Sequence, residues 1–204
     1  MAAPSRLNSL LIATAAVVVL SIVAAVYVLA PSALGRIAAQ AAPIGGPFRL
    51  TTHKGEPLSD VDLKGRPFAI FFGFTHCPEI CPTTLWELSE TLQQLGPAAD
   101  DLNVVFVSLD PARDTPEMLN TYLQSFDPRI IGLTGSQGEI EALAKAFKVY
   151  WRKVPTAGGD YTLDHTALVY LMDRNGMFVG TLAYQQEAAV RIDKLKRLLA
   201  GETL

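Results

Sequence analysis

One stretch, from Phe68 to Pro82, indicates both the fold and the chemistry of this chain: it reads FAIFFGF up to Phe74 and then THCPEICP. The first half is apolar on both faces, as in a central strand that is covered by helices. Apolar residues then recur at helical spacing from Pro82 to Leu95. The two cysteines between these segments are the only cysteines of the 204 residues. They therefore lie at a predicted strand-to-helix junction.

Cys77 and Cys81 have a spacing that permits redox or metal chemistry. The start of a helix lowers the pKa of a thiol, and two sulfurs one helical turn apart can bind the same metal ion or form a disulfide. Pro82 suits the first helical position, which places Cys81 at the helix cap. Two cysteines are too few for a disulfide scaffold outside the cytoplasm. They indicate one redox or metal site.

The beginning of the chain is apolar and uncharged. No charged residue occurs from Leu7 to Gly35, and Leu10 to Ala30 is an almost unbroken apolar run of 21 residues. Such a run reaches across the roughly 30 Å of hydrocarbon in a bilayer, whereas the apolar region of a cleaved signal peptide has about 7–15 residues. We therefore expect residues 1–30 to be a membrane anchor, with Arg6 in the cytoplasm and the bulk of the chain on the far side.

The remainder divides into a tether and one domain. Residues 31–47 are rich in Ala, Gly and Pro and are typical of a flexible tether. Residues 48–204 are enough for a single domain with its own core. Arg6 and Arg36 precede this domain, which leaves it 15 of the 17 basic residues against 20 acidic ones, a net charge of −5. That balance argues against nucleic acid as a partner.

The hydrophobic pattern of the domain alternates between strands and helices. We expect strands at residues 48–52, 68–74, 103–109, 130–134, 166–172 and 177–183, helices at 82–95, 115–126, 136–147 and 187–199, and a hairpin or loop formed by 150–154 and 161–163. This order is that of a thioredoxin-like α/β fold, a central mixed sheet with flanking helices. The CxxxC motif then lies at the carboxyl end of a central strand.

A histidine occupies a position where thioredoxin-type reductases have a cis-proline. The residues before the predicted strand 166–172 end in Asp164-His165-Thr166, without a proline. An imidazole there adds a third ligand to the two thiolates, and this soft set suits copper as Cu(I) or Cu(II). A structural zinc site requires four ligands, and the candidates for a fourth are poor. His76 precedes Cys77 and could increase the thiolate character of this cysteine. His53 is expected to be exposed.

Three blocks of the sequence resemble the Sco/SenC family of copper-delivery proteins. They are GFTHCPEICP at residues 73–82, VSLDPARDTP at 107–116 and DHT at 164–166, and the likeness runs from about Phe48 to the C-terminal helix. The resemblance implies copper bound by two Cys and one His. It also implies delivery of that copper to the dinuclear copper site of cytochrome c oxidase subunit II, or reduction of the cysteines of that site.

With the predicted anchor, the resemblance implies a single-pass protein of the bacterial inner membrane. Its domain is then in the periplasm, or on the equivalent intermembrane-space side, where another copper protein can act as the copper donor. Cys77 and Cys81 can ligate copper only as thiolates, so a disulfide between them must abolish copper binding until it is reduced.

His76, Asp110, Arg113 and Asp164 are candidates for supporting the ligands or docking a partner, but the Asp110 segment can also be a plain turn with helix caps. The function that the sequence favours is that of a metallochaperone, for which no enzymatic activity beyond thiol–disulfide reduction is expected. The alternative is a thiol–disulfide oxidoreductase in which His165 is incidental. A peroxidase is a weaker third hypothesis, because no residue that supports a peroxidatic thiolate can be placed.

Overall fold

A computed structural model describes residues 15–27 and 43–204, which belong to two separate compact units, Met1–Ala42 and Pro43–Leu204. In the first unit, residues 15–27 are helical. The rest of the expected anchor and most of the expected tether, residues 1–14 and 28–42, lie outside the described residues.

The expected transmembrane helix is wrong for the part of the chain that the structure describes. None of the helices within residues 15–27 and 43–204 combines the length and the apolar character that crossing a bilayer requires.

The second unit is built on a seven-stranded mixed sheet in the order β2-β1-β5-β4-β3-β8-β9. Its strands are β1 (Arg49–Thr52), β2 (Pro57–Ser59), β3 (Phe68–Gly73), β4 (Asn103–Ser108), β5 (Ile130–Thr134), β8 (Leu168–Met172) and β9 (Phe178–Ala183). The helices are α2 (Asp60–Leu63), α3 (Ile80–Leu95), α4 (Pro116–Leu123), α5 (Gln137–Ala146) and α6 (Ala188–Ala200), with a 3₁₀ turn, η1, at Gly96–Asp101. This is the predicted thioredoxin-like α/β fold.

The two central strands carry the core. β3 and β4 are parallel, and every residue of both is buried. β5 continues the parallel part beyond β4, whereas β8 lies antiparallel to β3 on its other side. Because these strands are covered on both faces, they read as continuous apolar runs instead of alternating ones. The carboxyl ends of β3 and β4 point to the same edge of the sheet, and the loops that follow them meet there.

Helix α3 begins earlier than the sequence pattern indicates. Its first residue is Ile80 and its N-cap is Glu79, so Cys81 lies inside the first turn and not at the cap as predicted. The reason is that none of the first four N–H groups of a helix has an intrahelical acceptor, so Pro82 is tolerated as the third residue as well as the first. The thiol of Cys81 is therefore held by helical backbone.

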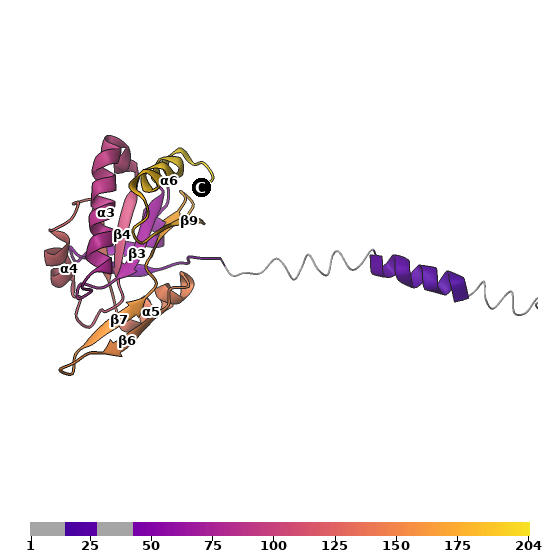
Figure 1. Cartoon of the computed structure of the whole chain (residues 1–204), viewed down its shortest axis with the longest axis horizontal. Coiled ribbons are helices and arrows are strands. Elements are labelled where there is room, and N and C mark those ends of the chain that lie inside the picture. Colours follow the sequence, from indigo (N-terminus) through magenta and orange to yellow (C-terminus); the bar gives the residue numbers. More distant parts are fainter. Residues whose placement is uncertain (1–14, 28–42) are drawn as a thin grey trace, which may run out of the picture. The chain divides into compact units, whose positions relative to one another are not determined.

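A separate two-stranded sheet follows α5. It consists of β6 (Trp151–Pro155) and β7 (Tyr161–His165), which pair antiparallel with each other, from Trp151 opposite His165 to Pro155 opposite Tyr161. We call it the β6–β7 hairpin. Figure 1 shows it projecting beyond the central sheet, near α5. The chain returns from its end, at His165, directly into β8.

Candidate metal centre

Three segments bring three donor atoms together at the carboxyl edge of the sheet. Cys77 lies in the loop after β3, Cys81 lies in the first turn of α3, and His165 ends β7. Their sulfur and nitrogen atoms all lie within 4.8 Å of one another. Cys81 Sγ is 3.5 Å from His165 Nε2, although the two residues are 84 positions apart in sequence.

The imidazole of His165 is oriented for ligation through Nε2. Its Nδ1 lies 3.0 Å from the carbonyl oxygen of Thr166, and since a carbonyl only accepts, Nδ1 carries the proton and donates it. This leaves Nε2 with its lone pair toward Cys81. The rings of Phe71 and Phe74 lie 6.2 and 5.9 Å from the imidazole, measured between centroids. The ring is thus fixed by one hydrogen bond and by apolar packing.

The two thiols have opposite electrostatic environments. Hydrogen bonding with the Cys81 thiol, assisted by the backbone N–H groups of Glu79 and Cys81, lowers the pKa of Cys77 to about 4. The N–H of Cys81 donates to Cys77 Sγ over 3.3 Å. Burial raises the pKa of Cys81, whose side chain is fully inaccessible. At neutral pH, Cys77 is therefore a thiolate, and Cys81 keeps its proton until a metal ion or a reaction partner displaces it.

This donor set fits a soft metal ion. Thiolates select copper(I) and zinc, and an imidazole adds a ligand that copper accepts in both oxidation states. Structural zinc is held by a closed set of four ligands, whereas this cluster supplies three. Both cysteines are free thiols in this structure. The same two sulfurs are close enough to form a disulfide, in place of binding a metal ion, after a local change of the loop.

An open pocket gives access to the cluster. It has a volume of about 380 Å³, and its lining includes Phe74, Cys77, Glu79, Tyr150 and His165. Cys77 is 9 % exposed, whereas Cys81 is inaccessible and does not line the pocket. A partner that enters the pocket therefore meets Cys77 and His165 first.

Gly73 makes room for the buried sulfur. A Cβ atom at this position would lie 2.6 Å from Cys81 Sγ and 2.9 Å from the ring of Phe106. Both distances are shorter than real Cβ contacts, so no side chain fits without moving the thiol. An isolated glycine in an otherwise bulky strand is a known sequence signal of such a close approach.

We expect Gly73→Ala to reduce the free energy of unfolding by about 1–3 kcal/mol and to weaken metal binding, because the added methyl group displaces Cys81. Urea unfolding and metal titration measure the two effects. Gly138→Ala is the matched control, since its added Cβ meets nothing within 4 Å. An unchanged metal affinity in Gly73→Ala would contradict this role of Gly73.

The other residues that the sequence proposed near the ligands lie in different surroundings. His76 is exposed, and its Nδ1 lies 3.0 Å from Thr75 Oγ1 and 3.9 Å from the carboxylate of Asp114. Asp164 lines the same pocket as Cys77 and His165, but its carboxylate forms an exposed ion pair with Arg152 over 2.8 Å. Because alternate residues of a strand point to opposite faces, Asp164 and its neighbour His165 face away from each other.

His53 was expected to be exposed, and this is wrong. It is half-buried, and its Nδ1 accepts the N–H of Gly132 over 3.0 Å. Burial lowers its pKa. His53 therefore joins the end of β1 to β5 and lies on a different part of the sheet from the cluster.

Asp110 and Arg113 do not touch the ligands but contact the β6–β7 hairpin. The hydroxyl of Tyr161 donates to Asp110 over 2.8 Å, and Arg113 donates to the carboxylate of Asp160 over 3.1 Å. Sequence analysis missed Tyr161 and Asp160. The one available signal was the period of two that places Tyr161 on the same face of β7 as His165.

Comparisons with known proteins agree with this geometry. Residues 37–200 match the SCO1/SenC family. The mouse (Mus musculus) protein SCO1 homolog, mitochondrial, is 41 % identical over 149 residues, which cover 72 % of this chain and 52 % of the mouse protein. An SCO2-like protein of Rickettsia felis is 42 % identical over 138 residues, 67 % of each chain. The chain spans about half the length of the mouse and human relatives that it matches.

Solved structures show the same fold. Bradyrhizobium japonicum ScoI, determined with copper bound, has 50 % sequence identity and a TM-score of 0.72, and the match covers 76 % of this chain and 99 % of that one. BsSco is a member of the Sco family of cytochrome c oxidase assembly proteins in which a disulfide switch has been identified. It has 26 % identity and a TM-score of 0.61, and the match covers 77 % of this chain and 95 % of BsSco. With the family match over most of its length, this chain belongs to the SCO1/SenC family.

Proposed function

We propose that this protein is a copper chaperone of cytochrome c oxidase assembly. It binds one copper ion through Cys77, Cys81 and His165 and delivers it to the dinuclear copper site of oxidase subunit II. The observation that carries this proposal is the convergence of two sulfurs and one imidazole nitrogen within 4.8 Å. The Nδ1 proton of His165 is already engaged, which leaves Nε2 for the metal.

The relatives support copper as the cargo. ScoI of Bradyrhizobium japonicum and Sco1 of yeast have both been determined with copper bound, at 50 % and 35 % identity to this chain. BsSco supports the link to cytochrome c oxidase assembly. Cytochrome c oxidase is therefore the proposed partner, and the subunit II site is the finer part of the proposal.

The geometry suits transfer by ligand exchange. Cys77 and His165 face the open pocket, so incoming thiolates of a partner can replace them first. Cys81 is the most deeply buried donor and releases the ion last. A site with three ligands keeps room for an entering ligand, whereas a closed set of four does not.

A second candidate function is reduction of the partner's cysteines. The specific observation is the pairing of a thiolate that lines the open pocket, Cys77 with its pKa of about 4, with the inaccessible thiol of Cys81. Cys77 attacks a partner disulfide and releases one partner thiolate. Cys81, once deprotonated, then attacks Cys77 and releases the second, so the two electrons come from the thiols of Cys77 and Cys81, which are oxidised to a disulfide.

The relatives are mitochondrial and bacterial proteins. We propose that this domain works in the bacterial periplasm or in the equivalent mitochondrial compartment, where a thiol pair can alternate between dithiol and disulfide. Another copper protein of that compartment is the proposed donor.

A transfer experiment tests the chaperone function directly. The full-length chain, reduced and loaded with Cu(I), is mixed with the metal-free copper-site domain of subunit II, and the copper content of both is measured after separation. We expect one copper per chain before mixing and most of it on subunit II afterwards. Retention of all copper by the chain would contradict delivery.

A further inference from the structure

The β6–β7 hairpin carries one ligand but is not part of the main sheet. Its strands pair only with each other within the described residues. No residue of β6 is buried, and Leu163 is the one buried residue of β7. At its His165 end, β7 continues through two residues into β8, which is paired with β3. Within the described residues, no backbone pairing with the main sheet holds the far end of the hairpin, so side-chain contacts with the body must hold it.

Arg113 makes three such contacts with the far end of β7. Its Nη1 donates to Asp160 Oδ1 and to the carbonyl oxygen of Tyr161, both over 3.1 Å. Its guanidinium carbon lies 3.8 Å from the centroid of the Tyr161 ring. The planar, forked guanidinium can make all of these contacts at once, which a lysine ammonium cannot.

Asp110 completes the attachment from the body side. It is 1 % exposed and accepts hydrogen bonds from Arg113 Nε and from the Tyr161 hydroxyl. A buried carboxylate is costly unless its oxygens are paired, so the loss of either partner is unfavourable. The tyrosine is thus held at its ring by Arg113 and at its hydroxyl by Asp110.

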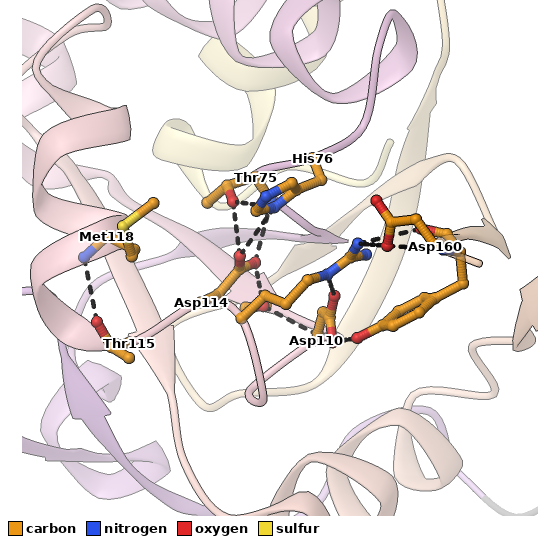
Figure 2. A network of polar contacts seen from close by, with 10 residues as sticks. Thr75, His76, Asp110, Asp114, Thr115, Met118 and Asp160 are labelled. Atoms are coloured by element: carbon orange, nitrogen blue, oxygen red, sulfur yellow. Dashed lines mark hydrogen bonds and ion pairs between the residues drawn. The ribbon is translucent and has the colours of Figure 1, made fainter. Parts of the chain in front are cut away.

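Asp114, four residues further on, holds the loop of the cysteines. It is fully buried and accepts from the N–H of Thr75 over 3.0 Å and from its hydroxyl over 2.6 Å. Thr75 precedes Cys77 by two residues. Figure 2 shows that Asp114 points toward Thr75 and His76. Asp110 lies on the other side of this network, nearer to Asp160.

The turn between the two carboxylates is itself closed by backbone bonds. The N–H groups of Arg113 and Asp114 both donate to the carbonyl oxygen of Asp110, over 3.1 and 2.9 Å. One tight turn therefore contacts both segments that carry ligands. We call Asp110, Arg113 and Asp114 the brace.

We propose that the brace sets the separation between His165 and the two cysteines, with Arg113 as a positioning residue for His165. The inward face of β7 carries Tyr161, Leu163 and His165. Tyr161 attaches one end of the strand to the brace, Leu163 packs its middle into the core, and His165 places its other end at the metal site. The effect on copper rests on the proposed ligation by His165. The effect on the position of His165 does not.

The first test compares two arginines that both form ion pairs with the hairpin's aspartates. We expect Arg113→Lys in the full chain to weaken Cu(II) binding about tenfold, because the fork that holds β7 is lost while the charge is kept. Cu(I), which two thiolates can hold, should be affected far less. Arg152→Lys, in the exposed pair with Asp164, is the matched control and should bind both ions as the unaltered chain does.

A second pair of variants separates positioning from a general loss of structure. If Arg113 acts through His165, Arg113→Lys should have no further effect on copper affinity in a His165→Ala background. An equal weakening in both backgrounds would overturn the proposal, and so would unchanged Cu(II) binding of Arg113→Lys alone.

The third readout needs no copper. In the metal-free chain, the NMR signals of the His165 imidazole should broaden or shift in Arg113→Lys and in Tyr161→Phe, which removes only the hydroxyl on Asp110, but not in Arg152→Lys. Unchanged His165 signals in both brace variants would overturn the proposal. Absence of copper binding by the unaltered chain would instead refute the proposed function. The NMR measurement would then still test whether the brace positions His165.

Discussion

Replacement of His165 by alanine is expected to weaken Cu(II) binding by more than about 100-fold. Loss of a residue that hydrogen-bonds to a metal ligand typically weakens metal binding by about 10–100-fold, and here the ligand itself is removed. Cu(I) binding should fall much less, since two thiolates alone can hold this ion. Cys77 and Cys81 keep their places in this variant, because the loop and α3 fix them independently of the hairpin.

Competition titrations with a chelator of known affinity for each oxidation state measure the two effects. His53→Asn is the matched control, since His53 is a histidine outside the cluster and the asparagine oxygen can accept the Gly132 N–H in place of Nδ1. Undiminished binding of both ions by His165→Ala would rule out His165 as a ligand.

A strain that carries Cys81→Ser in place of the unaltered chain is expected to lose oxidase copper and most oxidase activity. Serine removes a thiolate that both candidate functions need, and its hydroxyl neither ligates copper as well nor forms a disulfide. Oxidase activity, oxidase copper and the amount of the variant chain in the cell are measured together, so that loss of the chain is not mistaken for loss of function.

Two additions to the growth medium distinguish the two functions in that strain. If delivery is the function, added copper should partly restore the oxidase. If reduction of the partner's cysteines is the function, copper should not help, whereas a small-molecule thiol should. Normal oxidase assembly in the Cys81→Ser strain under copper limitation would contradict both functions.

Much of the fold follows from local patterns in the sequence. The apolar runs that became β3 and β4 predict buried central strands, and the alternation of strands and helices predicts the thioredoxin-like order. The start of α3 was predicted two residues late, because the proline rule does not distinguish among the first helical positions. The expected membrane-spanning helix is the part of the fold prediction that the described residues contradict.

The candidate site was likewise predicted in part from neighbouring residues, whereas the rest of it depends on contacts between distant segments. The sequence by itself determined the cysteine pair and its place after a central strand, because strand, loop and helix are set by neighbouring residues. It also indicated His165, through a missing proline. Only the tertiary structure decided that Cys81 is fully inaccessible while Cys77 lines the pocket, and that hydrogen bonding makes Cys77 the thiolate.

The tertiary structure also decided which residues support the site. Arg113 and Tyr161 are 48 residues apart, and their contact depends on where an independent hairpin lies against the sheet. No local periodicity encodes such a pair, since it arises only when two loops meet at one edge. The physical reason is the same for the metal cluster: its donors belong to segments 84 residues apart, and packing of the whole domain alone brings them together.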